Sequence, residues 1–124
     1  MPQLPIVSII DDDGSVRVAI ERIVRSLDLV ARTFRSCHEF LSSPRFRESS
    51  CIIADVQMPG MTGVELLTTL KAMGLAIPFI FITAYPNERL RKEASDAGAI
   101  CFLNKPFDGA SIIACIEQAL DRRH

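Results

Sequence analysis

The sequence predicts a doubly wound α/β domain with a parallel sheet, and three observations lead to this fold class. Five short apolar runs rich in β-branched residues recur along the 124 residues, and segments with helical spacing separate them. The runs are nearly continuous rather than alternating, as expected for strands buried on both faces of a sheet. Strands that alternate with helices favour right-handed βαβ units with helices on both sides of the sheet. The predicted strands are Ile6–Ile10, Leu29–Phe34, Cys51–Ala54, Phe79–Ile82 and Ile100–Leu103.

Five helices are expected between and after these strands. A capping-box pattern, from Ser36 to Glu39, predicts the start of the second helix. The fourth helix, from about Asn87 to Ala97, has only a thin apolar face, so little buried area would hold it. It is a candidate for a mobile element, and a plain solvated helix is the alternative. The apolar stripes of the other helices are Val16, Ala19, Ile20, Ile23, Val24 and Leu27 in the first, Val64, Leu67 and Leu70 in the third, and Ile112, Ile113, Ile116 and Leu120 in the last.

The length and composition are those of one compact domain, which we expect to span residues 1–124. The chain is 48% hydrophobic and 23% charged, and its formal net charge is −1. This balance gives no electrostatic reason to expect direct binding to nucleic acid or to a membrane surface. No apolar run is long enough to span a bilayer, and the first five residues do not resemble a secretory signal. We therefore expect a cytoplasmic location.

The four cysteines stand singly, without a Cys-x-x-Cys pair. A disulfide or a zinc site is conceivable, but buried thiols are the favoured interpretation for Cys37, Cys51, Cys101 and Cys115. The two histidines, His38 and His124, are interpreted as ordinary surface residues.

Residues that can bind ligands or take part in a reaction collect where the predicted strands end. In a doubly wound sheet the binding site lies beyond the carboxyl ends of the strands. Three acidic residues, Asp11–Asp13, follow the first strand, Asp55 follows the third, Thr83 ends the fourth and Lys105 follows the fifth. Each residue alone has a bland explanation as a solvated loop residue, a cap or a surface lysine. Their common position at one edge of the sheet is what indicates a site.

The composition of this cluster indicates phosphoryl chemistry. Several carboxylates brought together need a compensating cation, and oxygen ligands without histidine or thiolate favour Mg2+. Lys105 suits a phosphate oxygen, and the Thr83 hydroxyl could donate to another. Together these residues describe a carboxylate nucleophile that attacks a phosphoryl group.

The motifs resemble those of response-regulator receiver domains of two-component signalling, in the style of FixJ-like regulators. The matching pieces run from Ile9-Ile10-Asp11-Asp12-Asp13 through Asp55-Val56-Gln57-Met58-Pro59-Gly60-Met61-Thr62-Gly63 and Ile82-Thr83-Ala84 to Lys105-Pro106-Phe107. The resemblance implies a flavodoxin-like (CheY-like) fold with a five-stranded parallel sheet in the order 2-1-3-4-5 and five helices.

The resemblance also implies a role for each matching position. Asp55 would be the phosphoacceptor, and Asp11, Asp12, Asp55 and the backbone carbonyl of Gln57 would hold Mg2+. Thr83 and Lys105 would contact the phosphoryl group, with a cis Lys105–Pro106 peptide, and Phe102 would be the switch aromatic. From strand geometry we expect Asp12 to be the closer metal ligand and Asp13 to cap the first helix. Gly60 and Gly63 would permit unusual backbone conformations in the loop after Asp55.

The implied partner is a sensor histidine kinase or a histidine phosphotransfer protein. The switching face, built from Phe102, the helix at 87–97 and the last helix, would bind an effector or a second copy in a homodimer. Such a domain assists its own phosphorylation and is not a conventional turnover enzyme. Bulky Gln57 and Tyr85 beside the site predict restricted water access and a long-lived phosphorylated state. Without a helix-turn-helix or a broad basic face, the chain is expected to be either a stand-alone regulator or a fragment of a longer one.

Two other functions compete with this interpretation, and one binding motif fails. Asp11-Asp12-Asp13-Gly14-Ser15 resembles the opening motif of haloacid-dehalogenase-type phosphatases, in which Asp11 would be the nucleophile and Asp13 the acid/base. That alternative leaves the motif around Asp55 unexplained. The other alternative is an interaction domain that works without phosphorylation. Such a domain would not need all the residues that phosphorylation requires, and this sequence has all of them. An EF-hand fails because Val16 stands where the loop requires glycine.

Overall fold

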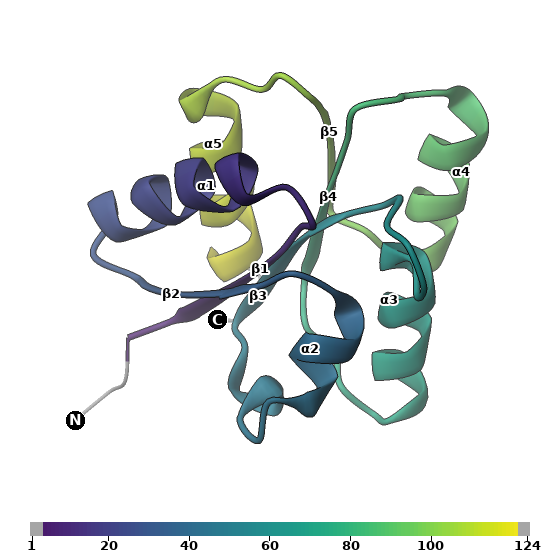
Figure 1. The fold of residues 1–124 in the computed structure, drawn as a ribbon, viewed down its shortest axis with the longest axis horizontal. Coiled ribbons are helices and arrows are strands. Elements are labelled where there is room, and N and C mark those ends of the chain that lie inside the picture. The colour runs from purple at the N-terminus through teal and green to yellow at the C-terminus, as the bar shows by residue number, and fades with distance from the viewer. Residues whose placement is uncertain (1–3, 122–124) are drawn as a thin grey trace.

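The computed structural model describes residues 4–121, which form a five-stranded parallel sheet covered by helices on both faces (Figure 1). The strand order is β2-β1-β3-β4-β5, and every neighbouring pair is parallel. The strands are β1 Ile6–Ile10, β2 Val30–Phe34, β3 Cys51–Asp55, β4 Phe79–Thr83 and β5 Cys101–Asn104. Five helices follow the strands: α1 Gly14–Ser26, α2 Cys37–Ser42, α3 Gly63–Ala72, α4 Glu88–Ala97 and α5 Gly109–Asp121. The predicted fold class is confirmed, and all predicted strand bounds are correct to within one residue.

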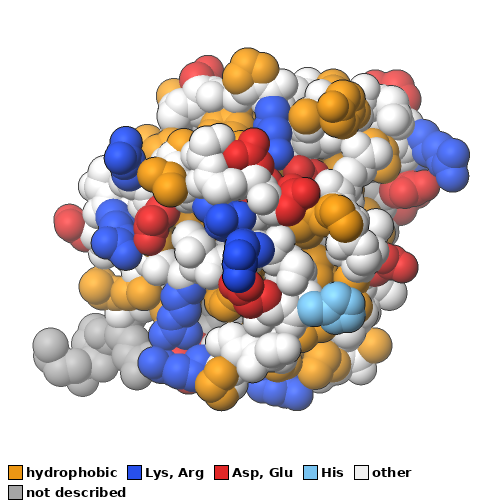
Figure 2. All heavy atoms as spheres, viewed as in Figure 1, with side chains coloured by type: hydrophobic (Ala, Val, Ile, Leu, Met, Phe, Trp, Pro, Cys, Tyr) orange, Lys and Arg blue, Asp and Glu red, His pale blue; other side chains and the backbone are white. Residues whose placement is uncertain are grey.

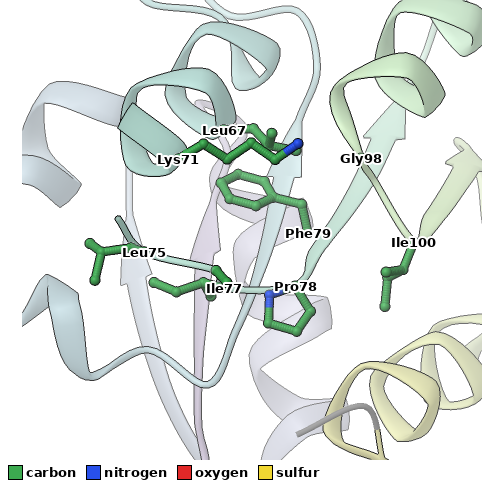
Figure 3. A pocket seen from close by; sticks show the side chains of 9 residues that line it. Leu67, Lys71, Leu75, Ile77, Pro78, Phe79, Gly98 and Ile100 are labelled. Carbon is green, nitrogen blue, oxygen red and sulfur yellow. The ribbon is translucent and has the colours of Figure 1, made fainter. Parts of the chain in front are cut away.

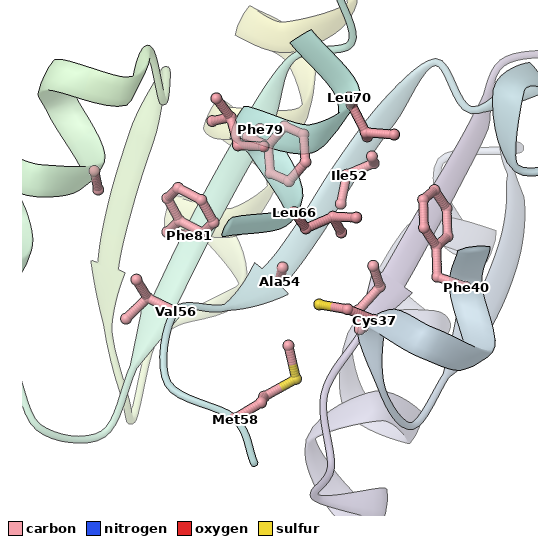
Figure 4. Close-up of a cluster of buried hydrophobic side chains, with 13 residues drawn as sticks. Cys37, Phe40, Ile52, Ala54, Val56, Met58, Leu66, Leu70, Phe79 and Phe81 are labelled. Atoms are coloured by element: carbon pink, nitrogen blue, oxygen red, sulfur yellow. The ribbon is translucent and has the colours of Figure 1, made fainter. Parts of the chain in front are cut away.

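Alternating side chains of the central strands build a separate core on each face. Ile52 and Ala54 of β3 point to one face, while Cys51 and Ile53 point to the other. The first face packs against α2, α3 and α4, and Figure 4 shows how Phe40, Leu66 and Phe81 contribute to it. The second face packs against α1 and α5. Because β1, β3 and β4 are fully buried, they read as continuous apolar runs in the sequence.

The helix starts largely follow the predicted capping residues. Asp13 caps α1, since its Oδ1 accepts the N–H of Ser15. Ser36 caps α2 by accepting the N–H of Glu39, but the Glu39 carboxylate accepts from Arg35 N–H rather than from Ser36, so the predicted capping box is only half formed. A complete capping box, which the pattern did not identify, opens α3 between Thr62 and Glu65. One short 3-10 turn, Phe46–Glu48, was also not predicted.

The weak attachment of α4 is confirmed as a packing feature. Ala94 is its buried residue, while its charged side chains face solvent. Two contacts compensate in part: Asn87 caps its first turn, and the Lys71 ammonium of α3 donates to the Ala97 carbonyl at 2.6 Å.

The cysteine interpretation is wrong for one pair. Cys101 of β5 and Cys115 of α5 form a disulfide, because the register of the last strand and helix brings their Cα atoms to 6.1 Å. Cys37 and Cys51 are buried thiols, as predicted. His38 is exposed, as predicted, and His124 lies outside the described residues.

Charged side chains of both signs are interspersed on the face shown in Figure 2. Several arginines form ion pairs with neighbouring glutamates: Arg25 pairs with Glu21, Arg35 with Glu39, and Arg45 and Arg32 with Glu48. Within residues 4–121, no helix combines the length and the apolar character that a membrane span requires.

Candidate functional site

Four loops at the carboxyl edge of the sheet bring the predicted site residues together. Asp11 and Asp12 follow β1, Asp55 ends β3, Thr83 ends β4 and Lys105 follows β5. One carboxylate oxygen from each of Asp11, Asp12 and Asp55 lies within 4.8 Å of the other two. Asp11 and Asp55 are buried, whereas Asp12 is exposed. The predicted convergence of these residues follows from β1 and β3 being neighbours in the sheet.

Asp11 is the most electrostatically constrained member of the cluster. Its Oδ1 accepts the backbone N–H of Asp13 at 2.8 Å. Its buried Oδ2 lies 3.0 Å from the ammonium nitrogen of Lys105 but accepts no well-directed hydrogen bond from the described residues. Burial raises the pKa of this carboxyl, and the Asp13 N–H and Lys105 only partly offset that effect. The oxygen therefore has unused capacity to bind a cation.

Asp55 is held by two different donors, one on each carboxylate oxygen. Oδ1 accepts the backbone N–H of Gln57 at 2.8 Å, and Oδ2 lies 2.9 Å from the Lys105 ammonium. Behind it, Gly63 leaves no room for a side chain, since a Cβ there would lie 2.9 Å from the Asp55 carbonyl oxygen and 2.7 Å from the Phe81 ring. Of the two glycines expected to need unusual dihedrals, Gly60 has a φ of +80°, but Gly63 serves close packing instead.

Lys105 joins the two buried carboxylates. Burial lowers the pKa of its ammonium group, but the contacts with the carboxylates of Asp55 and Asp11 and their negative charges outweigh this and leave the pKa raised. The lysine therefore stays charged at neutral pH. The Lys105–Pro106 peptide is cis, as expected, and the Lys105 N–H donates to the Thr83 carbonyl at 2.7 Å.

The two residues expected to relay the signal differ in their surroundings. Thr83 is fully buried, and its hydroxyl oxygen accepts the N–H of Tyr85 at 3.1 Å. Phe102 is half-buried at the edge of the core, and the Arg91 guanidinium of α4 lies 4.9 Å from the centre of its ring. Phe102 therefore links β5 to α4 in this structure.

A pocket of about 330 Å3 opens over Asp12, Asp55 and Lys105. Gln57 and Tyr85 stand at its rim, and Tyr85 is 74% exposed. Sequence reasoning missed one structural contact beside the pocket: Arg17, one turn into α1, donates to the Asp11 carbonyl at 2.6 Å. Only the position of an arginine one helical turn from the acidic run could have signalled it. The pocket is lined by Asp12, Asp13, Asp55, Gln57, Ala84, Tyr85 and Lys105.

The donor set fits a hard divalent cation. Three carboxylates offer only oxygen ligands, and Asp11 Oδ2 accepts no hydrogen bond from the described residues. Hard oxygen ligands with retained waters are what Mg2+ prefers. The residues present therefore fit the Mg2+ that the motif implies.

A second pocket, of about 350 Å3, lies at the opposite edge of the sheet and has a different chemistry (Figure 3). It is formed between the end of α3, the start of β4 and the chain just before β5, and its lining is apolar apart from Lys71. Unlike the first pocket, its lining contains no carboxylate.

The fold and the acidic pocket define a class of protein: a doubly wound α/β domain in which buried carboxylates, an exposed aspartate and a lysine meet at the carboxyl edge of the sheet. The family model for the response regulator receiver domain matches residues 7–117, and the chain belongs to this family. It is thus a receiver domain of two-component systems, and the predicted family is confirmed.

Individual relatives agree with this assignment. The chain is 38% identical over 122 residues to the transcriptional regulatory protein FixJ of Azorhizobium caulinodans, covering 98% of the chain and 58% of FixJ. It is 36% identical over 115 residues to the response regulator protein TodT of Pseudomonas putida, covering 93% of the chain and 51% of TodT. The crystal structure of FixJ-N superimposes with a TM-score of 0.85 at 34% identity, covering 97% of this chain and 96% of that one. The chain spans little more than half the length of these two curated relatives.

Proposed function

We propose that Asp55 accepts a phosphoryl group from a phosphohistidine of a sensor kinase or a histidine phosphotransfer protein. The observation that carries this proposal is the position of Asp55, which is buried beside Asp11 and Asp12 and in contact with the Lys105 ammonium. An ionised carboxylate is the nucleophile, and the donor imidazole is the leaving group.

Mg2+ would be held by Asp11, Asp12, Asp55 and the Gln57 carbonyl, and it would neutralise charge that develops on the phosphoryl oxygens. Lys105 already lies within 3.0 Å of both buried carboxylates, so a small movement transfers its contact from Asp55 to a phosphoryl oxygen. Thr83 must turn its hydroxyl toward the same group. The catalysis is positioning and charge neutralisation, which is why we do not assign the domain a turnover activity.

The output surface would be the α4-β5-α5 face. A phosphoryl group adds roughly two negative charges, and the response of Thr83 and Lys105 would shift an equilibrium between two arrangements of this face. Phe102 and Arg91, in contact between β5 and α4, are placed to report the change. The face would bind an effector or a second copy of the domain. We place residues 1–124 in one receiver unit, in the cytoplasm, without direct binding to nucleic acid.

The dehalogenase-type alternative is not supported by the receiver-family assignment. Asp13 is also occupied as the cap of α1, where its Oδ1 accepts both the N–H and the hydroxyl of Ser15. A receiver that binds partners without being phosphorylated would not need the complete acidic pocket.

Phosphate uptake tests this proposal. The protein is incubated with phosphoramidate, a small nitrogen-linked phosphoryl donor, and its intact mass is measured with and without Mg2+. We expect one phosphoryl group per chain that requires Mg2+ and is absent from Asp55→Asn, while Asp108→Asn, at an exposed cap of α5, behaves as the wild type. Uptake that persists in Asp55→Asn would refute the assignment.

We further propose that Gln57 and Tyr85 prolong the lifetime of the phosphorylated state by restricting the access of water. Gln57 and Tyr85 flank the pocket, so truncating either side chain should admit water. We expect Gln57→Ala and Tyr85→Ala to lose phosphate faster than the wild type after the donor is removed. Unchanged decay in both variants would show that the rim does not restrict water.

A further inference from the structure

The disulfide between Cys101 and Cys115 closes a covalent loop of the chain, and this loop contains functional residues. The two cysteines are 14 residues apart, and the chain between them includes Phe102, Lys105 and the cis Pro106. The bond therefore joins β5 to α5 directly, while the loop that carries the site lysine runs between the two bonded residues.

Without this bond, the connection between β5 and α5 depends on weaker contacts. β5 is an edge strand of the described sheet and pairs with β4, with Cys101 opposite Ile80. On the other side, Cys115 belongs to the apolar face of α5 that packs on β3 and β4. A covalent bond here restricts how far β5 and its following loop can shift relative to α5.

We propose that Cys101 and Cys115 form a reversible thiol–disulfide switch that regulates the receiver. In the disulfide form, β5 and α5 are held in the arrangement described here, and Lys105 and Phe102 respond less readily to phosphorylation. In the dithiol form, the same loop is free to follow the phosphoryl group. This inference rests on the proposed function of Asp55 and adds a second input to it.

The accessibility of the two sulfurs sets the order of the exchange. Cys101 is half-buried, while Cys115 is only 7% exposed, so Cys101 is the residue that an external disulfide reaches. The Cys101 thiolate attacks a small disulfide such as oxidised glutathione, forms a mixed disulfide and releases one glutathione thiolate. The Cys115 thiolate then attacks the Cys101 sulfur and expels the second. Two thiol protons pass to the two glutathione thiolates, so the protein loses two electrons and the glutathione disulfide gains them. In a reducing compartment, a disulfide of this kind is typically transient and redox-sensing.

Thiol counting and thermal unfolding test the bond itself, independently of phosphorylation. The chain has four cysteines and one pair is bonded, so alkylation after denaturation should label two thiols in the oxidised protein and four in the reduced one. Closing a ring of this length should raise Tm by roughly 10 °C, and reduction should reverse the shift. Cys115→Ser should resemble the reduced protein in both redox buffers. Cys37→Ala, outside the ring, should keep the redox-dependent shift. Four labelled thiols after treatment with oxidised glutathione would overturn the proposal.

The regulatory part is tested by phosphorylation of the two redox forms. Oxidised and reduced protein are titrated with acetyl phosphate in Mg2+, and the initial rate of phosphorylation is measured. We expect the reduced form to react at least about five-fold faster, a typical lower bound for coupled sites, and Cys115→Ser to be fast in both buffers. Equal rates in the two forms would overturn the switch while leaving the role of Asp55 intact. Phosphorylation that survives Asp55→Asn would instead refute the proposed function, and the two failures are therefore distinguishable.

Discussion

Replacing Lys105 by methionine removes the ammonium group that compensates the two buried carboxylates. In the protein its Nζ lies 2.9 Å from Asp55 Oδ2 and 3.0 Å from Asp11 Oδ2, and the lysine side chain is 16% exposed. Removing one partner of a fully buried ion pair costs about 3–5 kcal/mol. Because the methionine also avoids the burial cost of the ammonium, and the pocket is open to water, we expect a loss of about 2–3 kcal/mol in the free energy of unfolding. For a domain of this size that lowers Tm by roughly 10 °C.

The assay is urea unfolding followed by far-ultraviolet circular dichroism at pH 7, since the chain has no tryptophan. The loss should be largest without metal and should shrink in saturating Mg2+, because the cation supplies the missing positive charge. Lys92→Met is the matched control: its ion pair with Asp96 is 3.1 Å long but the lysine is 79% exposed, so the change should be below about 0.5 kcal/mol. Equal losses for Lys105→Met with and without Mg2+, or a loss as small as that of Lys92→Met, would refute the electrostatic reasoning.

Three further changes test the packing around the site. Gly63→Ala should lower the free energy of unfolding by about 1–3 kcal/mol in urea titrations, because a Cβ would lie 2.7 Å from the Phe81 ring. Gly74→Ala is the control: Gly74 has a φ of +81° but nothing within 4 Å of the added Cβ, so backbone strain alone should cost no more than about 2 kcal/mol. A smaller loss of unfolding free energy for Gly63→Ala than for Gly74→Ala would contradict this reasoning, because it would mean that the core rearranges to accommodate the added methyl group. Thr62→Ala breaks the capping box of α3 and should lower the free energy of unfolding by about 1 kcal/mol in the same assay. Thr68→Ala, at an exposed position within the same helix, should be nearly neutral. Equal effects of the two substitutions would argue against a stabilising cap at Thr62. Burial raises the pKa of the Cys37 thiol to about 11, so its alkylation at pH 8 should be slow until the protein unfolds. As the pH rises, the thiol ionises in the unfolded chain before it ionises in the folded protein. The stabilisation that the neutral, buried thiol contributes is therefore complete below its usual pKa and is lost as the pH rises through about 11. Rapid alkylation of the folded protein at pH 8 would contradict the burial of Cys37.

Much of this site was predictable because sheet topology converts sequence position into spatial position. Asp11, Asp55 and Lys105 each follow an apolar run, and parallel strands place such residues at one edge. The strand bounds were equally accessible, because β1, β3 and β4 are buried on both faces and leave uninterrupted apolar runs.

What could not be predicted depends on contacts between distant segments. The Cys101–Cys115 bond requires the relative register of β5 and α5, which spacing alone does not determine. The tight packing of Gly63 against Phe81 arises between α3 and β4, so the sequence suggested only an unusual backbone conformation at this glycine. The sharing of Lys105 between Asp11 and Asp55 likewise depends on how far its side chain is folded back into the pocket.

Borohydride trapping tests the central claim most directly, because it converts an aspartyl phosphate into homoserine at the residue that carried the phosphoryl group. The protein is phosphorylated with acetyl phosphate in Mg2+, reduced with borohydride, digested and sequenced by mass spectrometry. We predict homoserine at position 55, dependent on Mg2+ and absent from Asp55→Asn. Homoserine at Asp11, Asp12 or Asp13 instead, or its absence from every aspartate of the phosphorylated protein, would contradict the assignment of Asp55 as the phosphoacceptor.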